Sequence, residues 1–569
     1  MAEFDVVIRN GTVVEATGIP AYRADVGIKN GRIAQISGSI RGAGARELDA
    51  TGCIVAPGAV EQHAHYDGQI NWDPYCSLSG WHGMTSMTIG HCGYGVAPVR
   101  PEDREANMQL HSRIEAIPLH SMRAGIRWDW VTFPEYLDSL QRQGLGVNVG
   151  AMFAYSPARV WVMGAEEAAN RAYVTQEELA QVVALFREAL DAGAFGFSLN
   201  KNMADRPATG GYLPTHVATD DEFEAMAQVL GEYGLGGITM TLGSTDDQGR
   251  DMLVEKMAQA SGRPVQFAAL NYSDQDPEQY KRQLAWVENA KTRGLSIYGQ
   301  SIAMPIDPRF KLSEFNLFDD MPNWFTALLG TREERIERLQ RKETREGMKR
   351  DIAEWEETDF HKDWSKLNVL ETIHERNYKY DGMSIAEIAE TEGKDPVDAL
   401  LDLSLDEGLE TEFSLSGLIG GNAEADVETL MHPLTHPSFS DGGAHVRFFT
   451  TSTWPTYLLS HWVRDQGALT LEQAHYKMSA LPAWLAGFRD RGILRERMAA
   501  DAIVYNLDEI GFETDKPEYA TDFPGGEKRL IQKPRGMRYI LVNGTVTFEE
   551  NRCTGALPGS VLRSYDMIG

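Results

Sequence analysis

The chain has 569 residues, with 54 Lys and Arg against 83 Asp and Glu, and a formal net charge of −29 at pH 7. A chain of this length can bury a large core, and its acidic balance argues against nucleic acid or an anionic membrane as the main partner. We therefore expect a cytoplasmic protein with a small-molecule substrate, and a homo-oligomer is compatible with the sequence. The N-terminus lacks a basic, then apolar leader, and no apolar run is long enough to span a membrane. The four scattered cysteines indicate reduced thiols.

Short strands separated by turns are predicted at both ends of the chain. Asn10-Gly11 and Asn30-Gly31 each lie between apolar runs, a pattern that predicts two hairpins. Asn543-Gly544 marks a similar strand, turn and strand near the C-terminus. We expect the two ends to complete one small β-sandwich from residues 1–56 and 490–569.

The most informative segment is a pair of histidines behind an apolar run. Residues 53–60, which contain Pro57 and Gly58, predict a buried strand that leads into His63-Ala64-His65. Side chains two positions apart in an extended chain point to the same side. His63 and His65 are therefore expected to project together, and two neutral imidazoles can ligate one metal ion. The alternative is a pair of ordinary polar histidines at a strand end.

Two later segments carry further candidate ligands. Cys92 follows a β-branched and Met-rich run at residues 84–89, and a thiolate at a strand end could bind a metal. The alternative is a buried structural thiol. Asp441 stands between Ser440 and two glycines, where its carboxylate could bind metal, move a proton, or close an Asx turn.

Strand-like and helix-like segments alternate through the middle of the chain. This pattern favours a parallel sheet, arranged as a (β/α)8 barrel or as a doubly wound sheet. A charged stretch at 331–362 interrupts the alternation and predicts a solvated helical insertion. The predicted strands are 146–153, 194–199, 237–241, 264–269 and 295–299, and the clearest helices are 176–192 and 220–233.

Taken in order, these motifs resemble the amidohydrolase superfamily, and within it the N-acyl-D-amino-acid deacylase (D-aminoacylase) group. The resemblance implies a (β/α)8 barrel over residues 57–489, with a helical charged insertion near 305–380 and a β-sandwich from both termini. It also implies a catalytic site at the C-terminal ends of the barrel strands. The matching segments include Val7-Ile8-Arg9-Asn10-Gly11-Thr12, Val55-Ala56-Pro57-Gly58, His63-Ala64-His65, Gly90-His91-Cys92-Gly93, Ser440-Asp441-Gly442 and Val542-Asn543-Gly544.

The resemblance implies zinc as the cofactor, with ligands His63, His65, Cys92 and Asp441. Two further histidines usual in the family are missing, because the fifth strand ends in Thr239-Met240-Thr241 and the sixth in Ala268-Ala269-Leu270. No histidine occurs between His216 and His361. Because a catalytic zinc needs about three protein ligands, we expect one divalent metal per chain and not two.

Five other residues are candidates for substrate binding. Tyr155 occupies the position of a family histidine after the third strand, and Lys201 follows the fourth. His216 lies on an expected active-site loop, while His445 and Arg447 lie just beyond Asp441 and could contact an anionic group. For each of them a structural or surface role is the alternative. His91 is expected to point away from Cys92.

The resulting hypothesis is a metal-dependent hydrolase that cleaves an amide-type C–N bond of a small, N-acylated or aromatic substrate. Asp441 would take a proton from the metal-activated water and pass it to the leaving nitrogen. One alternative is lyase or isomerase chemistry on a degenerate metal site, with Asp441, His65, Tyr155 and Lys201 as acid–base groups. The other is a non-catalytic relative that binds a ligand.

Overall fold

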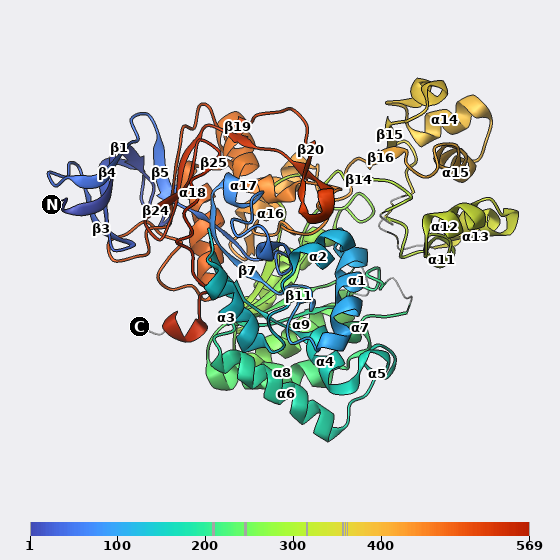
Figure 1. Ribbon diagram of the computed structural model, residues 1–569, viewed down its shortest axis with the longest axis horizontal. Coiled ribbons are helices and arrows are strands. Elements are labelled where there is room, and N and C mark those ends of the chain that lie inside the picture. The colour runs from blue at the N-terminus through green and yellow to red at the C-terminus, as the bar shows by residue number, and fades with distance from the viewer. Residues whose placement is uncertain are drawn as a thin grey trace.

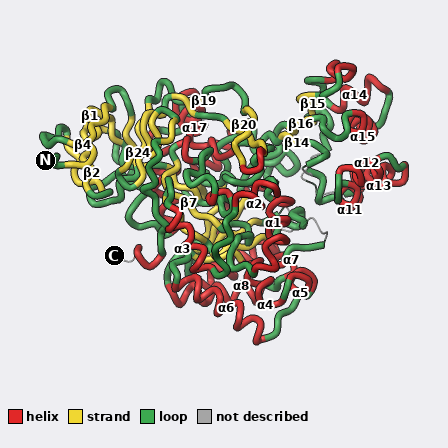
Figure 2. Tube along the Cα trace, in the orientation of Figure 1, coloured by secondary structure: helices red, strands yellow, loops and turns green. Residues whose placement is uncertain are grey.

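The computed structural model describes residues 2–207, 211–243, 247–314, 317–355, 358, 360 and 362–567. A central body of strands and helices carries a β layer with the N-terminus on one side and a separate helical lobe on the other (Figure 1). The strands of the body lie inside and its helices outside (Figure 2). Each helix in these ranges is too short or too polar to cross a membrane.

The central strands are all parallel and follow one another in chain order. β6, β7 and β8 form one sheet, and β9, β10, β11, β12, β13 and β17 form the next. Beyond β17, the Asp441 amide donates to the His63 carbonyl at 3.1 Å and the His65 amide to the Gly442 carbonyl at 2.6 Å. The chain after the last strand therefore lies beside the chain after the first. The bounds are β6 Ala59–Glu61, β7 Met84–Ile89, β8 Asn148–Ala151, β9 Phe153–Ala154, β10 Gly196–Asn200, β11 Gly237–Thr241, β12 Val265–Ala268, β13 Ile297–Gln300 and β17 Thr435–His436.

The helices of the body follow these strands, as the predicted alternation requires. Thr175 begins α6 with a capping box to Glu178, and Thr219 begins α8 with one to Glu222, so the two predicted helices start where a threonine satisfies the free amides. The bounds are α1 Arg104–Ile114, α2 Leu119–Gly125, α3 Phe133–Gln143, α4 Tyr155–Met163, α5 Ala165–Asn170, α6 Gln176–Asp191, α7 Pro214–Val217, α8 Asp220–Tyr233, α9 Asp247–Ser261, α10 Gln279–Thr292, α16 Ala423–Met431, α17 Trp454–Tyr457, α18 Leu471–His475 and α19 Leu481–Ala486.

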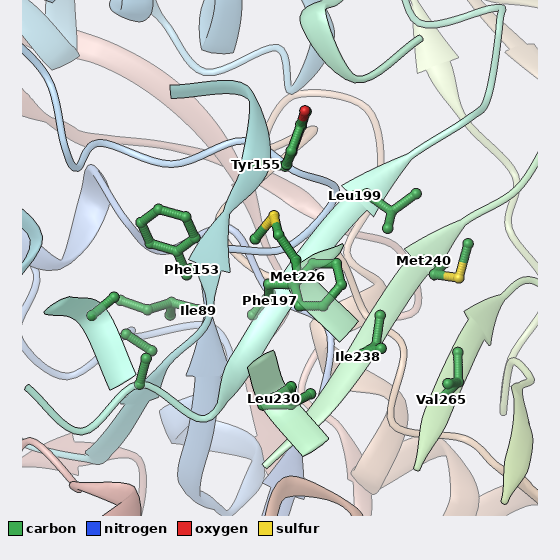
Figure 3. Packing of buried hydrophobic residues seen from close by; sticks show 14 of the residues in the cluster. Ile89, Phe153, Tyr155, Phe197, Leu199, Met226, Leu230, Ile238, Met240 and Val265 are labelled. Atoms are coloured by element: carbon green, nitrogen blue, oxygen red, sulfur yellow. The ribbon is translucent and has the colours of Figure 1, made fainter. Parts of the chain in front are cut away.

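Apolar and polar side chains alternate along the central strands. Ile238 and Met240 of β11 belong to the hydrophobic core that includes Met226 and Leu230 of α8 (Figure 3). Thr239, between them, points to the other face of the sheet and is also buried. The outward faces therefore pack on helices, while polar residues occupy the inner face and reach the cavity at the strand ends.

Strands from both ends of the chain pair in one nine-stranded sheet. The hairpin predicted at Asn30-Gly31 is confirmed, because Lys29 of β2 pairs with Arg32 of β3. The one predicted at Asn10-Gly11 is wrong: β1 continues through both residues, with Asn10 at φ +62° and a register shift between Ile8 and Gly11. This is a β-bulge. The bounds are β1 Phe4–Val13, β2 Tyr22–Lys29, β3 Arg32–Ser37, β4 Gly44–Asp49, β5 Ile54–Pro57, β18 Ala502–Tyr505, β23 Met537–Val542, β24 Thr545–Glu549 and β25 Arg552–Cys553.

The single strand predicted at residues 53–60 is in fact two strands in two sheets. β5 pairs with β1 and β18 in the terminal sheet, whereas β6 pairs with β7 in the central body. Gly58 separates them, and a Cβ there would lie 2.2 Å from a side-chain atom of Thr85. The crossing from one sheet to the other thus needs glycine, and it carries the chain directly to the histidine pair.

The helical lobe has its own hydrophobic core, which runs from Phe310 to Leu415. β16 returns to pair with β14 and β15, which is why the core extends beyond residue 380. Of the charged stretch 331–362, residues 356, 357, 359 and 361 lie outside the described part. The bounds are β14 Arg309–Phe310, α11 Pro322–Ala327, α12 Arg332–Leu339, α13 Lys342–Glu354, β15 Leu367–Glu371, α14 Ile385–Glu392, α15 Pro396–Asp406 and β16 Glu412–Leu415; the remaining strands are β19 Gly511–Phe512, β20 Glu518–Phe523, β21 Glu527–Ile531 and β22 Pro534–Arg535.

Candidate metal centre

The histidine pair lies immediately after β6, on backbone held by a buried glutamate. One carboxylate oxygen of Glu61 accepts hydrogen bonds from the amides of Gln62 and His63 at 3.0 and 3.1 Å. The other accepts from the indole nitrogen of Trp454 at 3.0 Å. Burial raises the pKa of Glu61 to about 7. The turn is therefore fixed, and the two imidazole rings lie with their centroids 5.4 Å apart.

Four side chains bring potential ligand atoms together. Nε2 of His63 lies 3.0 Å, and Nε2 of His65 3.6 Å, from Sγ of Cys92. Within the described ranges, these three residues form a group whose ligand atoms all lie within 4.8 Å of one another. Oδ1 of Asp441 lies 3.3 Å from Nε2 of His63 and 3.5 Å from Nε2 of His65. One metal ion could thus be reached by two nitrogens, a sulfur and a carboxylate oxygen.

The outward nitrogens of both imidazoles face acceptors on other elements. Nδ1 of His63 is 2.8 Å from Oε1 of Gln300, at the end of β13. Nδ1 of His65 is 3.6 Å from Oε1 of Glu115, just after α1. An acceptor on Nδ1 favours the tautomer whose Nε2 carries the lone pair, and outer contacts of this kind are typical of metal-binding histidines. Both Nε2 atoms are thereby presented to the same point.

Burial sets the protonation of the candidate ligands. It lowers the pKa of His63 to about 4, partly opposed by the Asp441 carboxylate, and that of His65 to about 3. Both imidazoles are therefore neutral at pH 7, which is the ligand form. Burial raises the pKa of the Cys92 thiol well above its usual range, so the thiol is protonated until a metal displaces the proton.

The backbone around these ligands adopts a conformation that side chains rarely permit. Cys92, Asp441 and His445 have φ of +53°, +50° and +49°, in the left-handed region where non-glycine residues are uncommon. Such positions persist where the surrounding structure holds them, and they gather at functional sites. Here three of them surround one group of ligand atoms.

Among the described residues, the opposite side of the same cavity offers no imidazole at the ends of β11 and β12. Thr241 of β11 and Ala268 of β12 are paired in register, and both line the cavity together with Ala269. The Thr241 hydroxyl lies 3.0 Å from Sγ of Cys92. Thr241 and Ala268 stand where the family usually has histidines, and they therefore face the candidate ligands.

The cavity has a volume of about 340 Å³, and its wall carries charged groups that the sequence did not mark. Glu115, Asp205 and Arg250 line it, and burial raises the pKa of Asp205 to about 6. His445 also lines it, as expected, with Nε2 3.7 Å from Oε2 of Glu115. No motif precedes Glu115 or Gln300, so only the folded arrangement reveals them.

Tyr155 does not reach the cavity, which corrects the prediction that it binds substrate. Its side chain is fully buried and donates a hydrogen bond to Glu222, which also pairs with Arg159 at 3.1 Å. Tyr155 stands beyond the strand end and belongs to the same apolar core (Figure 3). Its role here is to join α4 to α8.

Three other predicted substrate residues also lie elsewhere. Nζ of Lys201 donates to the carbonyls of His216 and Ala218 at 3.3 and 2.8 Å, and burial lowers its pKa to about 8. His216 caps α7, its Nδ1 3.5 Å from the Leu213 amide. Arg447 pairs with Glu314 at 2.5 Å and with Glu527, so it connects the lobe to β21. None of the three lines the metal cavity.

The ring nitrogens of His91 face two threonine hydroxyls and not Cys92. Its Nε2 is 2.9 Å from the Thr88 hydroxyl and its Nδ1 is 3.3 Å from the Thr239 hydroxyl. Its ring stacks on His63 with centroids 5.0 Å apart. His91 therefore supports the pair from the inner face of the strands.

Comparison with known proteins places this arrangement in a family. The sequence profile of the amidohydrolase family matches residues 46–548. An uncharacterized protein of Mycobacterium tuberculosis is 27% identical over 97% of this chain and 93% of its own length. The N-acyl-D-glutamate deacylase of Alcaligenes xylosoxydans xylosoxydans is 26% identical over 99% of this chain and 97% of its own.

Solved structures agree on the fold. The N-acyl-D-glutamate deacylase of Bordetella bronchiseptica, complexed with zinc and a phosphonate inhibitor, superposes with a TM-score of 0.68 at 22% identity, covering 98% of this chain and 99% of that one. A D-aminoacylase superposes with a TM-score of 0.66 at 21% identity, covering 98% and 100%.

Proposed function

Because the chain belongs to the amidohydrolase family, we propose that it removes the acyl group from an N-acyl amino acid by hydrolysing the amide bond. As a member of this family it is a metal-dependent hydrolase of C–N bonds other than peptide bonds. Relatives named as deacylases of N-acyl-D-glutamate and N-acyl-D-aspartate match it over nearly its whole length. This likeness supports an N-acyl-D-amino acid as the substrate.

The observation that carries the proposal is the ligand group of His63, His65, Cys92 and Asp441. Neutral imidazole, thiolate and carboxylate are the ligands that zinc prefers, and the outer contacts leave both Nε2 atoms available. Thr241 and the alanines opposite supply no comparable donor, so we propose one divalent metal per chain. When bound, this metal would polarise the scissile carbonyl and lower the pKa of a water molecule.

The remaining chemistry belongs to side chains around the cavity. Asp441, 3.3 Å from His63, takes the proton of the attacking water and delivers it to the leaving nitrogen. Arg250 is 8% exposed, pairs with Asp251 at 3.1 Å and lies in the cavity wall, and we propose that its guanidinium also binds the substrate carboxylate. His445 lies on the same wall and would orient the substrate.

We also propose that the parallel strands close into a (β/α)8 barrel over residues 57–489, with the lobe near 305–380 as an insertion. The contacts between His63 and Asp441 support closure, because they join the ends of the first and last strands. Residues 1–56 and 490–569 would form the small β-sandwich. The pairing of β5 with β18 supports this division, since it joins the two terminal segments.

Elemental analysis of the purified protein, combined with a panel of N-acetyl-D- and N-acetyl-L-amino acids, tests the function. We expect one metal per chain and release of free amino acid, with activity lost on chelation and restored by zinc. If the fully chelated protein still converts a substrate at the full rate without hydrolysing it, acid–base lyase or isomerase chemistry is favoured. Tight binding of these compounds without turnover would favour a binding relative.

A further inference from the structure

A second cavity, larger than the metal cavity, lies among α1, α4, α5 and α7. Its volume is about 580 Å³, and these four helices are neighbours on one side of the body (Figure 1). The two cavities have no described lining residue in common. Leu110 and Leu213 of its wall belong to one small hydrophobic cluster with Tyr94, Ile114 and Cys92. The second cavity therefore adjoins the ligand group through this cluster but has its own described lining.

The wall of this cavity is mainly apolar but includes two buried polar atoms without partners. Leu110, Val160 and Trp161 contribute large apolar surfaces. The Ser156 hydroxyl, in a residue 2% exposed, has no hydrogen-bond partner within the described ranges. Nor does Oδ1 of Asn107 there, although its amide nitrogen donates to the Gly95 carbonyl at 2.9 Å. An apolar cavity with a few available polar atoms is the usual form of a small-molecule site.

Charges of both signs lie on the same wall. The Arg100 guanidinium stacks over the Trp161 ring, 4.5 Å from its centroid. Asp103 and Glu166 also line the cavity. Across the described part of the chain, no ion pair is found for any of these three side chains. One guanidinium beside an aromatic ring, and two carboxylates on the same wall, are thus available.

We propose that this cavity binds a free apolar amino acid, aromatic or large aliphatic, as a zwitterion. Its carboxylate would pair with Arg100, a geometry that a planar guanidinium favours. Its ammonium would lie near Asp103 and Glu166, and its side chain would pack on Trp161 and Leu110. A ligand with only one charge would leave either the guanidinium or the carboxylates without a counter-ion.

Titration calorimetry on the metal-loaded, full-length protein tests the proposal with three matched ligands. Phenylalanine carries both charges, 3-phenylpropionate lacks the ammonium, and phenethylamine lacks the carboxylate. We expect one saturable site for phenylalanine and weaker binding of both analogues, by about two- to fivefold for each lost ion pair. Equal affinity for all three ligands, or no saturable binding in calorimetry and ligand-observed NMR, would overturn the proposal.

Two variants place the ligand in this cavity. Ala169→Phe puts a large side chain into the cavity wall and should abolish binding. Arg100→Gln should weaken the binding of phenylalanine and leave that of phenethylamine unchanged. Arg489→Gln is the matched control, because Arg489 stacks on Trp484 at 5.7 Å outside the cavity. Circular dichroism and thermal melting check that each variant is folded. If Ala169→Phe does not fold, the phenylalanine affinity of Arg100→Gln still tests the proposal. Unchanged phenylalanine affinity in a folded variant would mean that the ligand binds elsewhere, and the proposal would be wrong.

Discussion

The two halves of the metal cavity differ in their ligands although their strands are built alike. On one side, the chain after β6, β7 and β17 carries His63, His65, Cys92 and Asp441. On the other, β11 and β12 end in Thr241 and Ala268. Both halves alternate apolar outward faces with a polar inner face. The fold therefore does not depend on the ligands, and a few residues at the strand ends set the chemistry.

The halves differ also in what stands behind the cavity wall. Gln300 contacts the outward nitrogen of His63 at 2.8 Å, and Glu115 lies 3.6 Å from that of His65. Behind Thr241 and Ala268 lies the hydrophobic core of Ile238, Met240 and Phe267. A metal site needs its ligands and their supporting contacts together, and among the described residues the first half alone offers candidates for both. This contrast is the structural basis for expecting one metal per chain.

The largest expected effect comes from removing the proton carrier of the ligand-bearing half. Asp441→Asn keeps the shape but cannot accept a proton at pH 7, so kcat should fall by about 10²–10⁴-fold. Steady-state kinetics with the best N-acyl substrate measures this, and thermal melting checks the fold. Asp426→Asn is the control, since Asp426 is also a buried aspartate but accepts from the Gly421 amide and does not line the cavity. Unchanged turnover in Asp441→Asn would exclude the proposed role.

The support behind His63 should matter next. Gln300→Met removes the acceptor for Nδ1 of His63, and since no partner of the Gln300 amide nitrogen is found among the described residues, little else is lost. Metal affinity should fall by about 10–100-fold, measured by competition with a chromophoric chelator. Gln266→Met on the neighbouring strand is the matched control, because Gln266 contacts Gln62 instead of a ligand. Equal affinities of the two variants would contradict the assignment.

The pH dependence of metal binding separates this site from one made of ordinary histidines. The lowered pKa values, about 4 for His63 and about 3 for His65, keep both imidazoles neutral at pH 5. Only the Cys92 thiol, whose pKa is raised, would then lose a proton, so affinity should rise about tenfold per pH unit between pH 5 and 8. Equilibrium dialysis measures the slope. A steeper slope that begins near pH 6.5 would mean that the histidines titrate normally.

The sequence alone predicted the body of the fold because its signals there are local. The helix at 220–233 and the strand at 237–241 are found at those positions, since a capping threonine and a period of two define them within a few residues. Asn30-Gly31 forms its hairpin for the same reason. Asn10-Gly11 does not, because Gly11 lies against Val55, where a Cβ would be 2.4 Å from a methyl group. The conformation at Asn10-Gly11 thus depends on Val55, a residue distant in the sequence, which the local pattern does not include.

The candidate ligands were predictable and their surroundings were not. His63, His65, Cys92 and Asp441 stand in short motifs, so residue type and spacing marked them. Gln300 and Glu115 act through contacts across 237 and about fifty positions of the chain, and no local pattern encodes such pairs. Tyr155 was misplaced because its strand position is right but its hydroxyl is held by Glu222 on α8. The spacing of residues in the sequence predicts where the strand ends but not the direction in which the side chain points.

The smallest effect is expected from two substitutions that would give the second half of the cavity histidines like those of the first. Thr241→His combined with Ala268→His places two imidazoles at register partners, beside a Cys92 sulfur already 3.0 Å from the Thr241 hydroxyl. With Cys92 they would complete three donors, about the number that zinc requires, so elemental analysis should show two metals per chain. The single substitutions are the controls and should keep the wild-type content. If the folded double variant still binds one metal, then missing ligands alone do not explain the difference, and the apolar packing behind β11 and β12 must itself prevent a second site.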